Sequence, residues 1–371
     1  MRHFKLNLLA GLTIIFVGCS DGNDDPPLGP PKPNFSAQIS FGDSLSDVGT
    51  YRVGTVADLG GGQYTINSSN GTPTNWTELT APKFGLPAPC AAMTGLDGDP
   101  LQGFSVPATP HPGCTGYAQG GARVTDLVGP GNKSLGGANA TLGQLTVPVV
   151  TQIVNHLATT SGGTFSGTEV VFVMAGANDA FIQAELVKAG SKSSVDAISA
   201  MVSAANELAG LVKTQLIDKG AKYVVVINVP DISSTPQVTS IVDLNARREA
   251  KNLFDSLISA YNVVLITKLN IDLPNSPNLL VIDAFTLSKD QVANPTTYGF
   301  TNVTHTACDL TVPGPNPLGS SLVCNASNLI TGEDTSTYMF ADTVHPTPYN
   351  HSLFAGYVLQ QMASKGWYNN L

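Results

Sequence analysis

Residues 169–176 read "EVVFVMAG", a short run of apolar, mostly β-branched residues that ends in small ones. Two later segments have the same character: "AKYVVVINVP" at residues 221–230 and "NLLVIDAF" at residues 278–285. Apolar residues at nearly every position are typical of parallel strands that are covered on both faces. The three segments therefore predict a parallel sheet with helices packed against it.

Helical patterns separate these strands. Ser193 can cap a helix with Asp196 three positions later, and apolar residues then recur at helical spacing until Gly220. Further helices are expected at residues 244–266 and after His345, towards the C-terminus. Alternating strands and helices predict an α/β fold with right-handed crossovers, in which ligands bind beyond the carboxyl ends of the strands.

The first 18 residues have the pattern of a signal peptide. Arg2 and Lys5 precede an apolar run at residues 8–17 that is too short for a permanent membrane span. The run ends in "FVGC", which is similar to the bacterial lipobox, so Cys19 is expected to be acylated after cleavage. Ordinary secretory cleavage near the same point is the alternative.

Residues 19–33 are rich in Pro, Gly and Asp and are expected to form an extended tether. Residues 34–371 show no second linker and no repeat, so they are expected to form one domain. Ser20 follows Cys19 where inner-membrane lipoproteins carry Asp, which favours the outer membrane. We therefore expect an exported protein, either anchored to outer-membrane lipid through Cys19 or secreted.

The charge of the chain excludes some classes of partner. The formal charge is −9 and becomes −11 when the two basic residues of the signal peptide are removed, and no Lys or Arg residues cluster. Nucleic acid is not an expected partner, because binding phosphates requires a basic surface. Neutral or lipidic substrates fit better, and we expect a monomer.

Four cysteines remain after Cys19. Cys90 and Cys114 form one neighbouring pair, and Cys308 and Cys324 form another. An even number of cysteines in an exported chain predicts disulfides, here within each pair.

Two of these cysteines also allow a zinc site. His111 precedes Cys114 by three residues, and His305 precedes Cys308 by three. Two His-Cys pairs could bind zinc tetrahedrally, although the other two cysteines would then lack partners.

A candidate nucleophile follows the first expected strand. "SFGDSLSDVGTY" at residues 40–51 comes directly after the apolar alternation of residues 35–41, which places Ser44 at the carboxyl end of a strand. A serine needs a base to become a nucleophile. In "ADTVHPT", Asp342 precedes His345 by three residues, so the carboxylate can bind Nδ1 and leave Nε2 free for a hydroxyl. The structural alternative is an Asp at a helix start beside a satisfied His.

Two further stretches could supply hydrogen-bond donors. Gly121 lies in "YAQGGARV", where backbone can approach a ligand closely, and Asn178 lies in "MAGANDAF" after the strand at residues 169–176. Asp179 is expected to cap the following helix. Ser46 and Asp47 are expected to shape the loop beside Ser44, and Asp47 could also form a hydrogen bond across the site.

Taken in order, "FGDSLSDVG", "GGA", "GAND" and "DTVHP" resemble the four blocks of the GDSL esterase/lipase family, or SGNH hydrolases. The resemblance implies a flavodoxin-like three-layer α/β/α sandwich. It also implies Ser44 as nucleophile, His345 as base and Asp342 as its orienting acid. The oxyanion hole would be formed by the backbone N–H groups of Ser44 and Gly121 and the amide of Asn178. No metal and no organic cofactor is implied, and no serine lies in the G-x-S-x-G elbow of the α/β-hydrolases.

The expected reaction is cleavage of a carboxylic ester by a lipase, an esterase or a lysophospholipase, with a small-molecule or lipid ester as substrate. A phospholipid acyltransferase or a carbohydrate esterase could use the same triad. The approach to the glycine block, "CTGYAQGG", lacks an Asn that many relatives carry, and a long insertion separates it from the serine block, so substrate specificity stays open. The alternative of another class is a non-catalytic surface lipoprotein that binds glycans.

Overall fold

Four parallel strands form the central sheet, in the order β1-β4-β5-β6. They are β1 (Gln38–Gly42), β4 (Val170–Met174), β5 (Tyr223–Ile227) and β6 (Leu279–Ile282). The computed structural model describes residues 33–369, so the expected signal peptide, Cys19 and nearly all of the expected tether lie outside the described residues. Within the described part, the three strands expected from the sequence lie side by side.

A short segment around Gly116 lies beside β1 at the edge of the sheet and pairs with it through a single bridge. Ser40 in β1 donates its N–H to the carbonyl of Thr115 at 3.1 Å and accepts from the N–H of Tyr117 at 2.8 Å, in a parallel bridge with Gly116. This segment therefore lies where strand 2 lies in the flavodoxin-like order 2-1-3-4-5.

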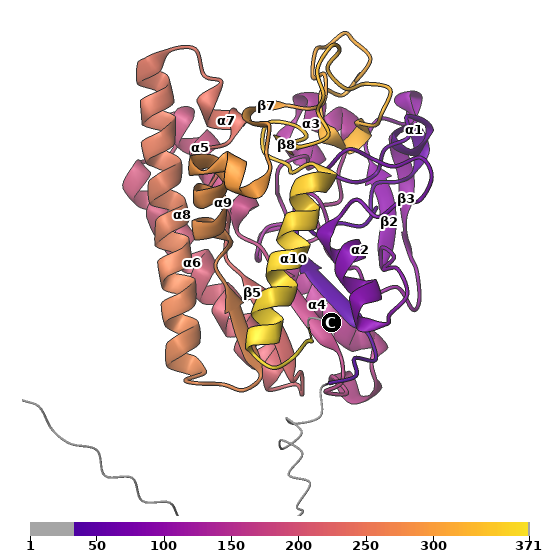
Figure 1. Cartoon of the computed structure of the whole chain (residues 1–371), viewed down its shortest axis with the longest axis vertical. Helices are drawn as coiled ribbons and strands as arrows, with labels where there is room; N and C mark the ends of the chain where they lie inside the picture. Colours follow the sequence, from indigo (N-terminus) through magenta and orange to yellow (C-terminus); the bar gives the residue numbers. More distant parts are fainter. Residues whose placement is uncertain (1–32, 370–371) are drawn as a thin grey trace, which may run out of the picture. The chain divides into compact units, whose positions relative to one another are not determined.

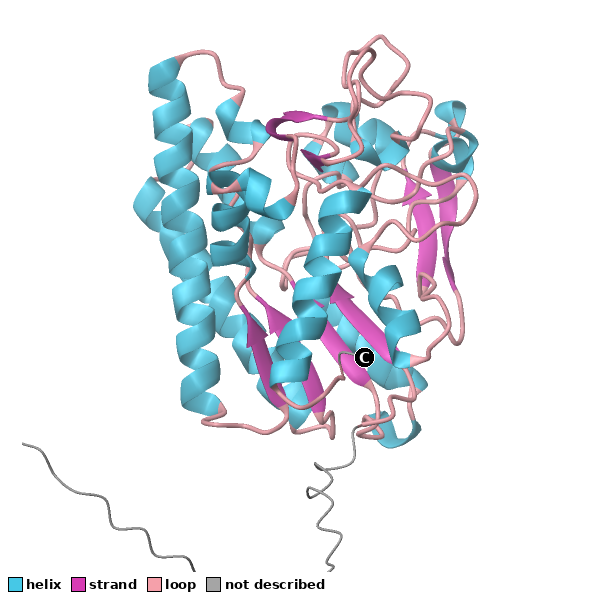
Figure 2. Ribbon diagram, viewed as in Figure 1, coloured by secondary structure: helices cyan, strands magenta, loops and turns pink. Residues whose placement is uncertain are grey.

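Helices cover both faces of the sheet (Figures 1 and 2). One face packs against α4 (Val149–Thr159), α5 (Ala177–Lys188), α6 (Ser194–Leu211) and α8 (Leu244–Asp272). The other packs against α2 (Trp76–Thr80) and α10 (Pro348–Ser364). The three-layer α/β/α fold expected from the sequence is confirmed.

The helix α6 begins as the sequence predicts. The Ser193 hydroxyl accepts from the N–H of Asp196 at 3.1 Å, and a π-helical turn (Val212–Ile217) extends the helix to just before Gly220. Residues 194–217 are long and apolar enough to cross a membrane by length and composition alone. Their apolar face instead packs in the core.

One helix is longer than predicted and another begins where expected. The helix α8 continues six residues beyond residue 266, and its buried face extends to Leu269. The helix α10 begins at Pro348, after His345 and an N-cap at Thr347, as the sequence predicts.

The first strand does not alternate as residues 35–41 suggest. All five residues of β1 are buried, because the strand has neighbours on both edges and helices on both faces. Its polar Gln38 is satisfied by donating to the Thr77 carbonyl at 2.8 Å and accepting from the Thr80 hydroxyl at 3.0 Å. Partners in α2 allow Gln38 to be buried, so the alternation in the sequence does not correspond to alternating exposure.

The segments outside the central sheet contain short elements. Residues 85–118 include an antiparallel hairpin of β2 (Met93–Asp97) and β3 (Ser105–Pro110). In the C-terminal part, β7 (Asn302–Thr306) pairs in parallel with β8 (Tyr338–Phe340). The other helices are α1 (Gly54–Asp58), α3 (Gly137–Leu142), α7 (Pro236–Thr239) and α9 (Ala284–Ala293). Short 3₁₀ turns lie at Ala81–Phe84, Pro100–Gln102, Lys133–Leu135, Ser161–Gly163, Pro295–Tyr298 and Ser321–Val323.

Two disulfides join Cys90 to Cys114 and Cys308 to Cys324, the pairing expected from their positions along the chain. The zinc alternative is wrong for this structure, because the sulfurs it requires are bonded to other cysteines. Both bridges hold segments that lie outside the central sheet.

Candidate active site

Ser44 lies in a tight turn at the carboxyl end of β1. Two residues earlier, Gly42 donates its N–H to Gln152 Oε1 and accepts from Gln152 Nε2, both at 2.8 Å. A Cβ on Gly42 would lie 2.2 Å from the carbonyl oxygen of Met174, so only glycine fits between β1 and β4. These contacts fix the backbone from which the Ser44 side chain enters the site.

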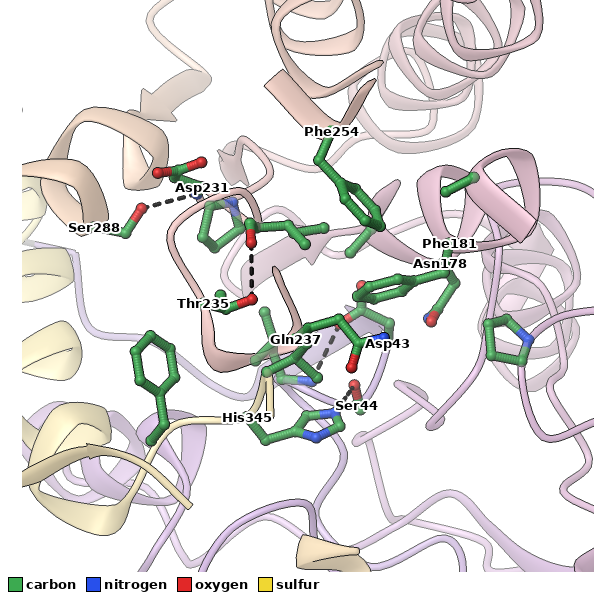
Figure 3. A pocket seen from close by; sticks show the side chains of 18 of the residues that line it. Asp43, Ser44, Asn178, Phe181, Asp231, Thr235, Gln237, Phe254, Ser288 and His345 are labelled. Atoms are coloured by element: carbon green, nitrogen blue, oxygen red, sulfur yellow. Dashed lines mark hydrogen bonds between the residues drawn. The ribbon is translucent and has the colours of Figure 1, made fainter. Parts of the chain in front are cut away.

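The predicted triad residues lie in hydrogen-bond contact. His345 Nε2 is 2.9 Å from Ser44 Oγ (Figure 3). His345 Nδ1 is 2.8 Å from Asp342 Oδ2 and 2.9 Å from Oδ1. An ionised carboxylate can only accept, so Nδ1 carries the imidazole proton and Nε2 can accept from the serine hydroxyl.

Asp342 is held as a carboxylate although it is buried. Burial alone would raise its pKa, but the neighbouring His345 and the hydrogen bonds to the carboxylate hold the pKa well below its usual range. The backbone N–H groups of Ser321 and Val344 donate to it, each at 3.0 Å. The carboxylate can therefore orient His345 throughout the neutral pH range.

An aromatic ring supports His345 from one side. The ring centroids of Tyr64 and His345 are 4.8 Å apart, and Tyr64 is 6% exposed. Tyr64 lies in a Gly-rich stretch far from His345 in the chain, so no local pattern in the sequence indicated this contact.

The three expected oxyanion donors line the same cavity. Within residues 33–369, no protein atom accepts a hydrogen bond from the backbone N–H of Ser44 or of Gly121. Gly121 has a φ of +77°, and a Cβ there would lie 2.1 Å from the Pro130 carbonyl oxygen, so glycine is required. Asn178 Nδ2 donates to the Ala122 carbonyl at 2.9 Å, which orients the amide and leaves its second N–H for a ligand.

Asp179 is not the helix cap that the sequence suggested. Gly176 occupies the N-cap of α5, and Asp179 lies inside the first turn. Its carboxylate accepts from Arg123 Nε at 2.9 Å and from the Val124 N–H at 3.1 Å. Asp179 therefore ties the segment after Gly121 to the helix that carries Asn178.

The expected loop role of Asp47 agrees with its contacts. Its carboxylate accepts from the N–H groups of Gly49 at 2.9 Å, Thr50 at 2.8 Å and Gly120 at 2.9 Å. The last bond connects the serine segment to the glycine segment. The Ser46 hydroxyl has no hydrogen-bond partner among the described residues, so its side chain does not support the same expectation.

Asp43 is a buried acid that sequence reasoning did not single out. It is 1% exposed, and Oδ1 accepts from the Leu45 N–H at 3.1 Å. Burial raises the pKa of Asp43 to about 7, against the lowering effect of that hydrogen bond and of His345. Its position immediately before Ser44, the candidate nucleophile, is the signal that could have marked it.

The cavity at the site has a volume of about 1520 Å³. Ser44, His345, Asn178 and Gly121 line one part of it, and Asp342 lies behind His345. The five residues predicted from the sequence are therefore brought to one place. Between residues 33 and 369, no group of three or more His, Cys, Asp or Glu residues is arranged to hold a metal ion.

Comparison with known proteins finds curated relatives in a plant. Over 181 residues it is 26% identical to the anther-specific proline-rich protein APG of Arabidopsis thaliana. This alignment covers 48% of the chain and 32% of that protein. Over 135 residues it is 28% identical to a GDSL esterase/lipase of the same plant, covering 36% of this chain and 32% of that protein. The chain thus spans about a third of the length of these curated relatives.

A solved structure, the phospholipase A1 from Streptomyces albidoflavus NA297, aligns with 90% of this chain and 100% of its own, at 14% identity and a TM-score of 0.37. A family model described as GDSL-like Lipase/Acylhydrolase matches residues 39–358. That match includes all four sequence blocks and nearly the whole sheet and its helices. The resemblance stated from the sequence is confirmed: the chain belongs to the GDSL-like lipase/acylhydrolase family.

Proposed function

We propose that this protein hydrolyses carboxylic esters through an acyl-enzyme on Ser44. The observation that carries the proposal is the continuous set of hydrogen bonds from Ser44 Oγ through His345 to Asp342, at the edge of a large cavity. The backbone N–H groups of Ser44 and Gly121, for which residues 33–369 provide no acceptor, and the oriented amide of Asn178 support it, because a developing oxyanion needs fixed donors.

In the first half of the reaction, His345 Nε2 takes the Ser44 proton while Oγ forms a bond to the carbonyl carbon. The carbonyl oxygen becomes an oxyanion and accepts from the three donors. His345 then gives the proton to the alcohol oxygen as the bond between the acyl carbon and that oxygen breaks. Asp342 stays ionised and stabilises the imidazolium.

In the second half, water replaces the alcohol. His345 takes a proton from the water, whose oxygen attacks the acyl carbon on Ser44. The ester bond to Oγ breaks, the carboxylic acid leaves, and His345 returns the proton to Ser44. An acyl acceptor other than water in this step would make the same triad an acyltransferase.

Replacement of the nucleophile tests the proposal. We expect Ser44→Ala to lower kcat on p-nitrophenyl butyrate by about 10⁴-fold or more and to abolish labelling by a fluorophosphonate probe. Ser46→Ala is the matched control, because it removes a hydroxyl two residues away that makes no hydrogen bond among the described residues. Full activity of Ser44→Ala would contradict the proposal, and an unlabelled wild-type protein would favour the non-catalytic glycan-binding alternative.

We further propose that the protein is exported and anchored by an acyl group on Cys19. The lipobox-like sequence and two disulfides support export, since disulfides persist in oxidising compartments. Expression of the full chain in a Gram-negative host should place it in the outer-membrane fraction, and Cys19→Ala should release it from that fraction. Equal fractionation of the two proteins would contradict acylation.

A further inference from the structure

The cavity continues from the catalytic residues into a groove between helices. The part of the cavity that is lined by α5, α6 and α8 is called the helix groove below. Its apolar lining includes Phe181, Ala184, Ile198, Ala250, Leu253 and Phe254. In Figure 3, Asn178 and Phe181 lie on the same helix beside the triad, with Phe254 facing them. The rings of Phe181 and Phe254 meet edge to face, with centroids 5.7 Å apart.

The groove has the length and polarity of a site for an alkyl chain. Residues from Asn178 to Lys188 on α5 follow it, and ten helical steps span about 15 Å. The charged residues of its lining, Glu185, Lys188 and Glu249, are exposed. Charge is thus confined to the solvent side, while the apolar lining belongs to or packs against the main core.

The direction of the groove decides which part of an ester enters it. His345 must protonate the leaving alcohol, so the alcohol lies on the side of the imidazole. The groove begins beside Asn178 and Phe181, away from His345 (Figure 3). The acyl chain of an ester bound at Ser44 therefore has this path open to it.

We propose that the helix groove binds the acyl chain and that the preferred substrates are esters of linear fatty acids much longer than butyrate. The inference rests on the proposed esterase function of Ser44. Each methylene buried in the groove should raise kcat/KM by about fourfold, until the chain reaches the exposed end.

The wild-type protein gives the first test, with p-nitrophenyl esters of increasing acyl length measured below their aggregation limits. A rise in kcat/KM from butyrate to dodecanoate is expected, and a flat or falling profile would overturn the inference. Methyl tridecanoate and dodecyl acetate place the same dodecyl chain on opposite sides of the ester. Preference for dodecyl acetate would show that the groove takes the alcohol and would also overturn it.

A variant that fills the groove gives the second test. Ala250→Phe adds a ring from α8 into the lining, and Ala293→Phe makes the same change at the exposed end of α9, outside the cavity. We expect Ala250→Phe to lower the ratio of dodecanoate to butyrate kcat/KM at least tenfold and Ala293→Phe to leave it unchanged. If the dodecanoate-to-butyrate ratio is the same in the two variants, the helix groove does not bind the acyl chain.

The two proposals fail in different ways. If Ser44→Ala still hydrolyses butyrate, the esterase proposal itself is wrong. If Ser44→Ala is inactive and the acyl-length profile is flat, the esterase proposal stands and only the helix groove inference fails. The acyl-length series uses the unmodified protein, so it decides even if Ala250→Phe does not fold.

Discussion

The sequence allowed a candidate triad to be selected, because the proposed chemistry limits the choice of residues. The strand-end position of Ser44 and the three-residue spacing of Asp342 and His345 carried that prediction, and the structure brings the three side chains into hydrogen-bond contact. Tyr64 could not be identified in the same way. Its contact with His345 depends on tertiary packing of segments far apart in the chain, which no local pattern reports.

Asp43 offers a prediction at the scale of one residue. Its pKa is raised by burial from 3.8 to about 7, so between those values the folded protein binds a proton that the unfolded chain has lost. The stability contributed by this group is therefore greatest below pH 3.8 and is lost as pH rises towards 7, by up to about 4 kcal/mol.

Asp43→Asn should remove that loss while keeping an oxygen to accept from the Leu45 N–H. We expect the variant to gain free energy of unfolding relative to the wild type at pH 8 but not at pH 4, measured by urea titration at both values. Asp58→Asn, an exposed change in α1, serves as control. A constant difference between Asp43→Asn and wild type across this range would show that Asp43 does not titrate as described.

Among the elements, those with strong local signals were predicted best. The strands β4, β5 and β6 have uninterrupted apolar runs, and α6 has a capping serine and an apolar face. The burial of strand β1 was harder to predict, because its polar Gln38 is satisfied by α2, an element that the sequence did not indicate. The role of Asp179 was also predicted wrongly from local sequence. An Asp can cap a helix or form an ion pair with a distant residue, and the sequence does not distinguish the two.

The ion pair of Arg123 and Asp179 gives a prediction for the element α5. It joins α5, which carries Asn178, to the segment that follows Gly121, so it connects two of the three proposed oxyanion donors. Asp179→Asn removes the charge but keeps an acceptor for the Val124 N–H. We expect kcat to fall by about tenfold, less than the loss of a whole donor would cause, with KM changed less than twofold.

The stability of Asp179→Asn separates positioning from folding. The Arg123 side chain is 12% exposed and keeps its bond to Asp126 at 2.7 Å, so the free energy of unfolding should fall by only about 1–3 kcal/mol. Asp126→Asn is the control, because it removes the other partner of Arg123 without touching α5. A loss of stability without a change in kcat would refute the positioning role.

For the whole molecule, the order of strands and helices was predictable because each βα unit has its own local signal. The segments outside the sheet were not, since residues 85–118 and 295–335 fold into hairpins and turns that depend on contacts with distant parts of the chain. The even number of cysteines in those segments was the one long-range signal, and it indicated the two disulfides.

The bridge between Cys308 and Cys324 lies close to Asp342, the proposed orienting acid. The Cys308 N–H donates to the carbonyl of Ala341, next to Asp342, at 3.0 Å. On the other side of the bridge, Cys324 follows the turn from which Ser321 donates its N–H to the Asp342 carboxylate. The bridge thus joins two segments that contact Asp342 or its neighbour.

Removal of each bridge should have different consequences for activity. Replacing Cys308 and Cys324 together by Ser should lower the free energy of unfolding by about 3 kcal/mol and also lower kcat severalfold, because Asp342 loses fixed partners. Replacing Cys90 and Cys114 by Ser should cost similar stability with kcat unchanged, since that bridge closes the hairpin of β2 and β3. Thermal unfolding and initial rates on p-nitrophenyl butyrate, measured well below both melting temperatures, distinguish the two. Equal kcat values in the two double variants would mean that the second bridge stabilises the fold without supporting the triad.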